Sequence, residues 1–128
     1  MNLLRIGDAI NMAKQSKGKK KVLRLGVIGS GGIAGAQLDR IKEDDDVALV
    51  AASDVDEKRV KAFTERFDMP MHFTDWNEMI AKADLDAVTI CTPNYLHYQP
   101  TIDALNAGLH VLIEKPLAMN AREGKEMV

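Results

Sequence analysis

Hydrophobic and polar positions follow two patterns along the chain, short apolar runs and stretches with apolar residues three or four positions apart. The first pattern is typical of strands buried on both faces, and the second of amphipathic helices. The apolar runs predict strands over residues 22–28, 47–52, 86–91 and 109–113, with a short extended piece at 71–73. The helical spacing predicts helices over 32–43, from 54–57 through 67, from 75 onward, over 97–107 and from 120 onward. In the first of these, one face is expected to carry Ile33, Gln37, Leu38 and Ile41.

The alternation of strands and helices defines a fold class. It predicts right-handed crossovers and an α/β fold in which helices cover both faces of a parallel sheet. The whole chain has 128 residues, which fits one domain. We place that domain at residues 22–128.

The N-terminal segment differs from the rest in charge. Residues 3–14 show helical spacing and a lysine-rich linker follows, so we interpret 1–21 as a basic amphipathic extension and linker. Residues 1–24 carry seven basic side chains and one acidic one, whereas the rest carries ten basic and eighteen acidic. A nucleic-acid contact is one interpretation of this arm. We favour a solvated lead-in, because the arm has no aromatic side chains on which bases would stack.

Composition excludes several classes of protein. A single cysteine excludes a disulfide scaffold and a zinc site built from cysteine clusters. No apolar run approaches the roughly 20 residues of a membrane span. We therefore expect a cytoplasmic protein with no metal site and with neither a membrane nor nucleic acid as partner.

A glycine-rich turn follows the first predicted strand and opens the first predicted helix. Gly29 permits the tight turn, Gly31 lets a pyrophosphate approach the backbone, and Ala34 lets the helix pack close to the strand. The helix N-terminus would present N–H groups to the anion. The segment, which matches G-x-G-x-x-A, is Gly29-Ser30-Gly31-Gly32-Ile33-Ala34.

An acidic residue stands at the distance that this motif requires. Asp54 ends the second predicted strand, 20 residues after Ala34, where a carboxylate can bind the adenosine ribose hydroxyls. The other interpretation of Asp54 is an N-cap of the next helix, a role compatible with ribose binding. Its charge would repel a 2′-phosphate, so NAD is favoured over NADP, although Lys58 and Arg59 follow closely. No Gly-Lys-Ser/Thr triplet is present, which excludes a P-loop. Together these features predict a Rossmann-type, doubly wound dinucleotide-binding domain.

Two later strand ends carry further polar motifs, Thr92-Pro93-Asn94 with His97, and Glu114-Lys115-Pro116. These motifs occur together with the glycine turn, Asp54 and the runs 86–94 and 104–111. In this combination the chain resembles the Gfo/Idh/MocA-type oxidoreductases, the group that contains glucose–fructose oxidoreductase and inositol 2-dehydrogenase. The resemblance covers roughly residues 22–128.

The resemblance implies a nicotinamide-dependent dehydrogenase that acts on a sugar, cyclitol or similar polyol, with a full-length form that is a homo-oligomer. It implies that Thr92, Pro93, Asn94 and His97 lie along the nicotinamide half of the cofactor. Glu114 and Lys115 would face the nicotinamide ribose and the substrate. Lys115 is the expected catalytic residue, because an ammonium group stabilises oxyanion character as hydride leaves carbon. Pro116 would fix the turn that aims this lysine.

The resemblance also implies a second domain that supplies the substrate pocket, and residues 22–128 do not include one. We therefore expect this chain to be the cofactor-binding part of a longer enzyme, inactive alone. The alternative is a stand-alone NAD-binding or sensing module without dehydrogenase activity. The remaining distinctive side chains, which we interpret as core or packing residues, are Phe63, Phe67, Trp76, Cys91 and His110.

Overall fold

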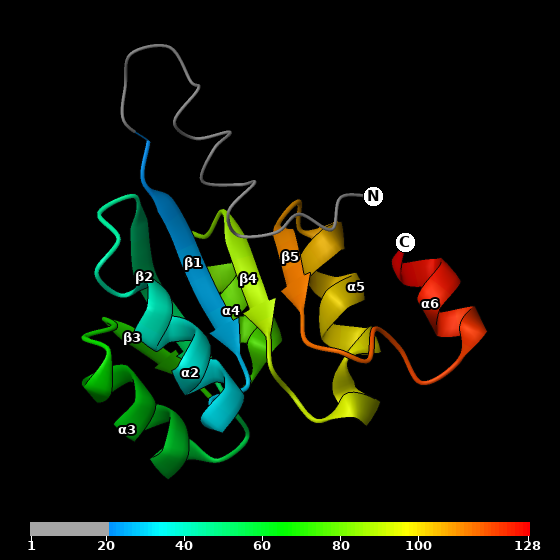
Figure 1. Cartoon of the computed structure of the whole chain (residues 1–128), viewed down its shortest axis with the longest axis horizontal. Helices are drawn as coiled ribbons and strands as arrows, with labels where there is room; N and C mark the ends of the chain where they lie inside the picture. Colours follow the sequence, from blue (N-terminus) through cyan, green and yellow to red (C-terminus); the bar gives the residue numbers. More distant parts are fainter. Residues whose placement is uncertain (1–20) are drawn as a thin grey trace.

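The computed structural model describes residues 21–128, shown in Figure 1, and the helix predicted over 3–14 lies outside this range. Each strand and helix predicted within the range is present. The strands are β1 (Leu23–Ile28), β2 (Val47–Ser53), β3 (Met71–Phe73), β4 (Ala87–Ile90) and β5 (His110–Ile113). The helices are α2 (Gly32–Ile41), α3 (Glu57–Arg66), α4 (Trp76–Lys82), α5 (Tyr98–Asn106) and α6 (Ala121–Met127), with a 3-10 turn η1 (Asn94–Leu96).

The five strands form one parallel sheet in the order β3-β2-β1-β4-β5. The chain builds outward from β1 to β3, then returns to the other side of β1 for β4 and β5 (Figure 1). The strand order therefore reverses at β1, and the helices that follow β1 and β4 cover opposite faces of the sheet. In open α/β sheets this switch point, at the carboxyl ends of the strands, is where ligands bind.

Helices cover both faces of the sheet, which confirms the doubly wound prediction. One core packs Val27 of β1 against α2 and α3, through residues such as Leu38 and Phe63. The other packs Ile28 of β1 against α4 and α5, through residues such as Met79 and Ala104. Successive β1 side chains thus enter opposite cores, as the pleat of a strand requires.

Helix starts and stops follow the local sequence. Asp56, Asp75 and Asn120 are the N-caps of α3, α4 and α6, and each side chain accepts a backbone N–H of the first turn at 2.8–3.1 Å. After α5 the chain turns at Gly108, whose φ of 81° favours glycine. The N-cap interpretation of Asp54 is wrong, because the N-cap of α3 is Asp56 and Asp54 accepts the N–H of this cap residue rather than one from the first turn of the helix.

Helix α2 differs from its prediction in two respects. It ends at Ile41 rather than at residue 43, because the acidic residues that follow form turns instead of continuing the helix. Ile33, expected on the packed face with Leu38, is 58% exposed. The buried face is formed by Ala34, Gly35 and Leu38, because the close approach of α2 to the sheet selects small residues near its start.

Candidate functional site

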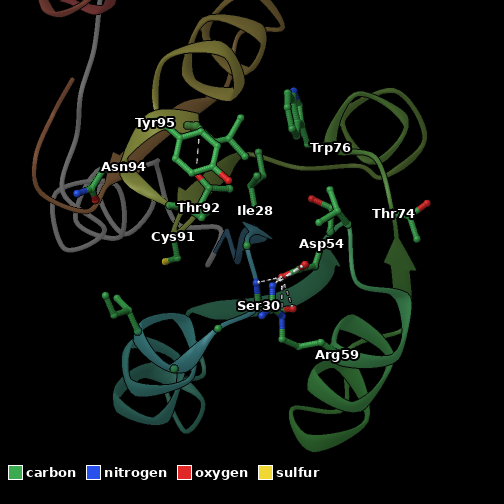
Figure 2. Close-up of a pocket in the computed structure, with 18 residues that line it drawn as sticks. Ile28, Ser30, Asp54, Arg59, Thr74, Trp76, Cys91, Thr92, Asn94 and Tyr95 are labelled. Carbon is green, nitrogen blue, oxygen red and sulfur yellow. Dashed lines mark hydrogen bonds and ion pairs between the residues drawn. The ribbon is translucent and has the colours of Figure 1, made fainter. Parts of the chain in front are cut away.

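A pocket of about 480 Å³ opens at the carboxyl ends of the central strands (Figure 2). Its volume lies within the range of small-molecule sites. The glycine turn, the end of β2 and the loop after β4 supply most of its lining. The lining comprises residues 28–33, 53–55, 59, 74, 76 and 91–96.

Gly29 makes the turn at the base of the pocket. Its φ is 91°, and a Cβ at this position would lie 2.7 Å from the Cys91 carbonyl carbon and from Thr92 N. Only glycine therefore lets the turn after β1 lie directly against the loop after β4. Ala34, one turn into α2, is fully buried, in agreement with its expected packing role.

Gly31 and the start of α2 leave room for an anion. A Cβ on Gly31 would meet no heavy atom within 4 Å, so the space beside this backbone is open. Gly31 is the N-cap of α2, it supplies no side-chain hydrogen bond, and the first turn has no acidic residue. The free N–H groups and positive end of the helix dipole therefore favour a phosphate here.

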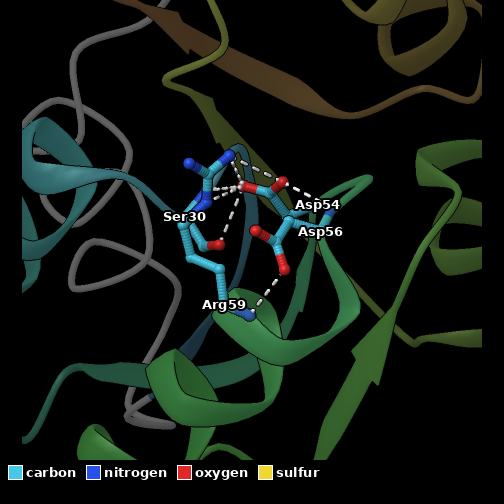
Figure 3. A network of polar contacts seen from close by, with 4 residues as sticks. All are labelled: Ser30, Asp54, Asp56 and Arg59. Carbon is cyan, nitrogen blue, oxygen red and sulfur yellow. Dashed lines mark hydrogen bonds and ion pairs between the residues drawn. The ribbon is translucent and has the colours of Figure 1, made fainter.

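The Asp54 carboxylate lies at the other side of the pocket and is held by four groups (Figure 3). Ser30 N and Oγ each donate to Oδ2 at 2.9 Å, and Asp56 N donates to Oδ1 at 3.0 Å. The Arg59 guanidinium donates to both oxygens, from Nε at 3.1 Å and Nη2 at 2.9 Å. Asp54 thereby joins the glycine turn to the start of α3.

Asp54 is charged in the fold. Burial acts to raise its pKa, but the hydrogen bonds from Arg59, Asp56 and Ser30 outweigh burial and lower the pKa to about 2. The Asp54 side chain is 4% exposed and that of Arg59 is 53% exposed. Of the four groups that hold Asp54, the Arg59 guanidinium is therefore the one that can move into solvent. Its movement would free the Asp54 carboxylate to bind a ribose diol.

Ser53 adds a buried polar atom beside Asp54. The residue is 2% exposed, and its hydroxyl has no hydrogen-bond partner within residues 21–128. A buried hydroxyl without a partner is costly, and Ser53 carries this cost at the lining of the pocket.

The loop after β4 forms the wall that faces Asp54. Thr92, Pro93 and Asn94 all line the pocket, and the loop is closed by a hydrogen bond from Thr92 Oγ1 to Leu96 O at 2.9 Å. Tyr95, 69% exposed, stands at the pocket rim.

Four residues of the predicted site lie outside the pocket lining: Ala34, His97, Glu114 and Lys115. His97 is 1% exposed and its ring faces backbone carbonyls rather than the cavity. Glu114 accepts a hydrogen bond from Gln37 Nε2 of α2, and Lys115 is exposed at the end of β5. The Lys115–Pro116 peptide bond is cis. The remaining predicted residues are brought together: Gly29, Ser30, Gly31, Gly32, Ile33, Asp54, Thr92, Pro93 and Asn94.

Two lining side chains were expected only to pack. Trp76 does pack against the sheet, and its Nε1 donates to Asp103 Oδ2 at 2.9 Å, but the indole also borders the pocket. Cys91, expected in the core, is partly buried and also borders the pocket, and burial raises the pKa of its thiol to about 11. The position of Cys91 directly before Thr92 is the one sequence signal that indicates this role.

The parallel sheet, its switch point and the glycine turn beside an acidic strand end define a dinucleotide-binding fold of the Rossmann type. Residues 23–128 match the model of the oxidoreductase family with an NAD-binding Rossmann fold (GFO_IDH_MocA), and the chain belongs to this family. The family resemblance that the motifs indicated is thereby confirmed.

Two named relatives are each 34% identical to this chain over the aligned residues. Myo-inositol 2-dehydrogenase of Thermotoga maritima is 34% identical over 106 residues, which are 83% of this chain and 32% of that protein. The NADP(+) scyllo-inositol 2-dehydrogenase IolU of Bacillus subtilis is 34% identical over 107 residues, 84% of this chain and 33% of the relative. The chain thus spans about a third of the length of these relatives.

A solved structure shows the same fold. Scyllo-inositol dehydrogenase of Lactobacillus casei, crystallised with NAD(H) and scyllo-inositol, superposes with a TM-score of 0.78 at 29% identity, over 84% of this chain and 32% of that one. Within residues 21–128 no helix is long and apolar enough to cross a membrane, and no cluster of three metal-ligating side chains is present.

Proposed function

We propose that residues 22–128 form the cofactor-binding domain of a dehydrogenase that transfers a hydride between a nicotinamide cofactor and a sugar, cyclitol or similar polyol. The observation that carries the proposal is one pocket with an open glycine turn on one side and the charged Asp54 on the other. Family membership supports it. The alternative of a stand-alone sensing module has no comparison in its favour.

The phosphate groups of the cofactor fit the glycine turn. The uncapped start of α2 and the open space beside Gly31 would hold the pyrophosphate through backbone N–H groups. Ser30, whose hydroxyl and N–H both bind Asp54, would link the phosphate site to the ribose site.

The adenosine ribose fits Asp54, and this contact favours NAD. A carboxylate whose pKa lies near 2 is an acceptor for ribose hydroxyls and repels a 2′-phosphate at neutral pH. Arg59 acts in the opposite direction, since its guanidinium lies within the same pocket and can pair with a phosphate. We propose NAD as the preferred cofactor. Because Arg59 can pair with the 2′-phosphate of NADP, we expect it to reduce this preference.

The nicotinamide end would lie along Thr92, Pro93 and Asn94, toward the turn that carries Glu114 and Lys115. The bound cofactor supplies hydride acceptance and donation at its nicotinamide ring. The exposed ammonium of Lys115 would hydrogen-bond the reacting hydroxyl and stabilise the developing oxyanion. Glu114, held by Gln37, would keep the turn in place beside it.

The activity of the whole protein is part of the proposal. Since the matched region covers about a third of its relatives, the substrate pocket and the subunit contacts of a homo-oligomer would come from outside residues 22–128. We expect this chain alone to bind NAD without oxidising a polyol. A cytoplasmic location is proposed because the single cysteine fits a reducing compartment.

Calorimetric titration with NAD and NADP tests the proposal. The wild-type chain and an Asp45→Ala control, which removes one exposed carboxylate distant from the pocket lining, are expected to bind NAD equally. Asp54→Ala is expected to bind NAD about tenfold more weakly, a loss of about 1.4 kcal/mol. A folded wild-type chain that binds neither dinucleotide would overturn the proposal.

A further inference from the structure

Two loops meet beyond the ends of β4 and β5, and a single side chain joins them. The sheet pairing of β4 and β5 ends at Ile90 and Ile113, with a last backbone bond from Glu114 N to Ile90 O at 3.2 Å. Past this point the loop of Thr92 lines the pocket, whereas the turn of Lys115 and Pro116 does not. The imidazole of His97 lies between them, with Nε2 at 2.9 Å from Thr92 O and Nδ1 at 2.7 Å from Pro116 O.

The backbone of His97 is fixed on both sides. His97 is the residue before α5, and its carbonyl accepts Thr101 Oγ1 at 2.6 Å and Thr101 N at 3.3 Å. Its N–H donates to Asn94 O at 3.3 Å. The ring therefore projects from the rigid start of a helix into the space between the two loops.

The two partners of the ring are both acceptors. A backbone carbonyl has no hydrogen to donate, so each contact is a hydrogen bond only when the ring nitrogen carries a proton. With 1% exposure, the ring has no room for water to replace either carbonyl. The rigid ring presents one nitrogen to each carbonyl, and the tautomer decides which nitrogen donates. An amide side chain carries both of its hydrogens on one nitrogen and has no second ring edge to place against the other carbonyl.

We propose that His97 is a positioning residue for the nicotinamide half of the site, acting through the two carbonyls and not by contact with the cofactor. The His97 bridge, meaning the contacts of its two ring nitrogens with Thr92 O and Pro116 O, sets the distance between the pocket wall and the turn that carries Lys115. This inference rests on the proposed function, because it assumes that a dinucleotide occupies the pocket. It replaces the direct cofactor contact that the resemblance implied for His97.

Binding of ADP-ribose and of NADH distinguishes a positioning role of His97 for nicotinamide from a general role in stabilising the fold. ADP-ribose contains the adenosine, both phosphates and the second ribose but lacks nicotinamide, so the Asp54 and Gly31 contacts hold both ADP-ribose and NADH. We expect the wild-type chain to bind NADH more tightly than ADP-ribose. In His97→Gln we expect ADP-ribose affinity within about twofold of wild type and NADH affinity about tenfold lower. His72→Gln, an exposed histidine of β3, is the matched control and should change neither affinity.

The two titrations distinguish a failure of this inference from a failure of the proposed function. Equal loss of both ligands in His97→Gln would show a merely structural residue and overturn the inference, as would no loss of either. Equal affinities of the wild-type chain for NADH and ADP-ribose would also overturn it, since there would be no nicotinamide contact to position. A folded wild-type chain that binds neither ligand contradicts the proposed function itself.

A second measurement needs no variant and covers the case in which His97→Gln does not fold. Proton NMR of the wild-type chain in water detects ring N–H protons only when they exchange slowly with solvent. The buried His97 ring, held between the two carbonyls, predicts at least one such slowly exchanging proton on this histidine, assigned through couplings to the ring carbons. The absence of any slowly exchanging ring proton on His97 would show that the ring is not held between the two loops and would overturn the inference.

Discussion

The Arg59 guanidinium and the Asp54 carboxylate form a two-point ion pair inside the pocket, with Nε 3.1 Å from Oδ2 and Nη2 2.9 Å from Oδ1 (Figure 3). The carboxylate that would bind the ribose is therefore already occupied by a cation. Ser30 and Asp56 supply the other hydrogen bonds and belong to the backbone framework of the site. A ribose diol that reaches Asp54 has to displace Arg59, and the displaced guanidinium stays near the adenosine.

Replacing Arg59 should therefore sharpen cofactor preference. In Arg59→Gln no charge pair opposes the ribose diol, and no guanidinium pairs with a 2′-phosphate. We expect the ratio of NADP to NAD dissociation constants to rise about tenfold, since a charge-assisted hydrogen bond contributes about 1.5–3 kcal/mol. Calorimetry with both dinucleotides measures the ratio. Lys58→Gln removes the same charge from an adjacent exposed position outside the pocket lining, and a change of equal size there would contradict the assignment.

The lowered pKa of Asp54 predicts acid sensitivity of the fold. The folded value of about 2 lies below the ordinary 3.8, so the ionised form stabilises the fold above about pH 4, and this contribution is lost as the pH falls from 4 to 2. Its size is at most about 2.5 kcal/mol. Urea unfolding between pH 4 and pH 2 measures this loss. The difference in unfolding free energy between wild type and Asp54→Asn should become smaller as the pH falls. A difference independent of pH would contradict the charge assignment, and Asp45→Asn controls for the loss of one exposed carboxylate.

Two glycines of the same turn should respond in opposite ways. Gly29→Ala places a Cβ 2.7 Å from the backbone of Cys91 and Thr92 at a φ of 91°, so we expect a loss of at least about 2 kcal/mol in unfolding free energy. Gly31→Ala meets nothing within 4 Å and changes only the N-cap residue of α2, so the loss of stability should not exceed about 1 kcal/mol. Its Cβ would instead occupy the phosphate space and weaken NAD binding. Urea unfolding and NAD titration of both variants test the contrast, and a Gly31→Ala chain as destabilised as Gly29→Ala would contradict it.

The sheet and the glycine turn could be predicted because their signals are local. Apolar runs mark strands buried on both faces, and the turn residues directly follow such a run. The distance from Ala34 to Asp54 is set by one helix and one strand, so the sequence encodes it. These features place Gly29, Gly31 and Asp54 in one pocket without knowledge of any long-range contact.

The rest of the site depends on contacts between segments far apart in the chain. Trp76 starts α4, and its place at the pocket follows from the packing of α4 on α5 through Asp103, which no spacing reveals. Glu114 is turned toward α2 by Gln37, a partner 77 residues away. His97 looks like a ligand residue because it follows the Thr92-Pro93-Asn94 loop, but the start of α5 directs its ring inward. Periodicity shows which side of an element is buried and not which partner buries it.

The thiol of Cys91 offers a direct readout of the pocket wall. Burial raises its pKa to about 11 from the ordinary 9.0, so the thiolate fraction at about pH 8 is roughly 100-fold lower than in the unfolded chain. Because Cys91 is the only cysteine, the rate of alkylation by iodoacetamide reports this position alone. We expect alkylation of the folded chain to be at least about 100-fold slower than in urea at the same pH, and slower still with NAD bound, because Cys91 borders the pocket. A folded chain that reacts within about tenfold of the unfolded rate would contradict the burial of this thiol, and a rate unchanged by saturating NAD would contradict its place in the cofactor pocket.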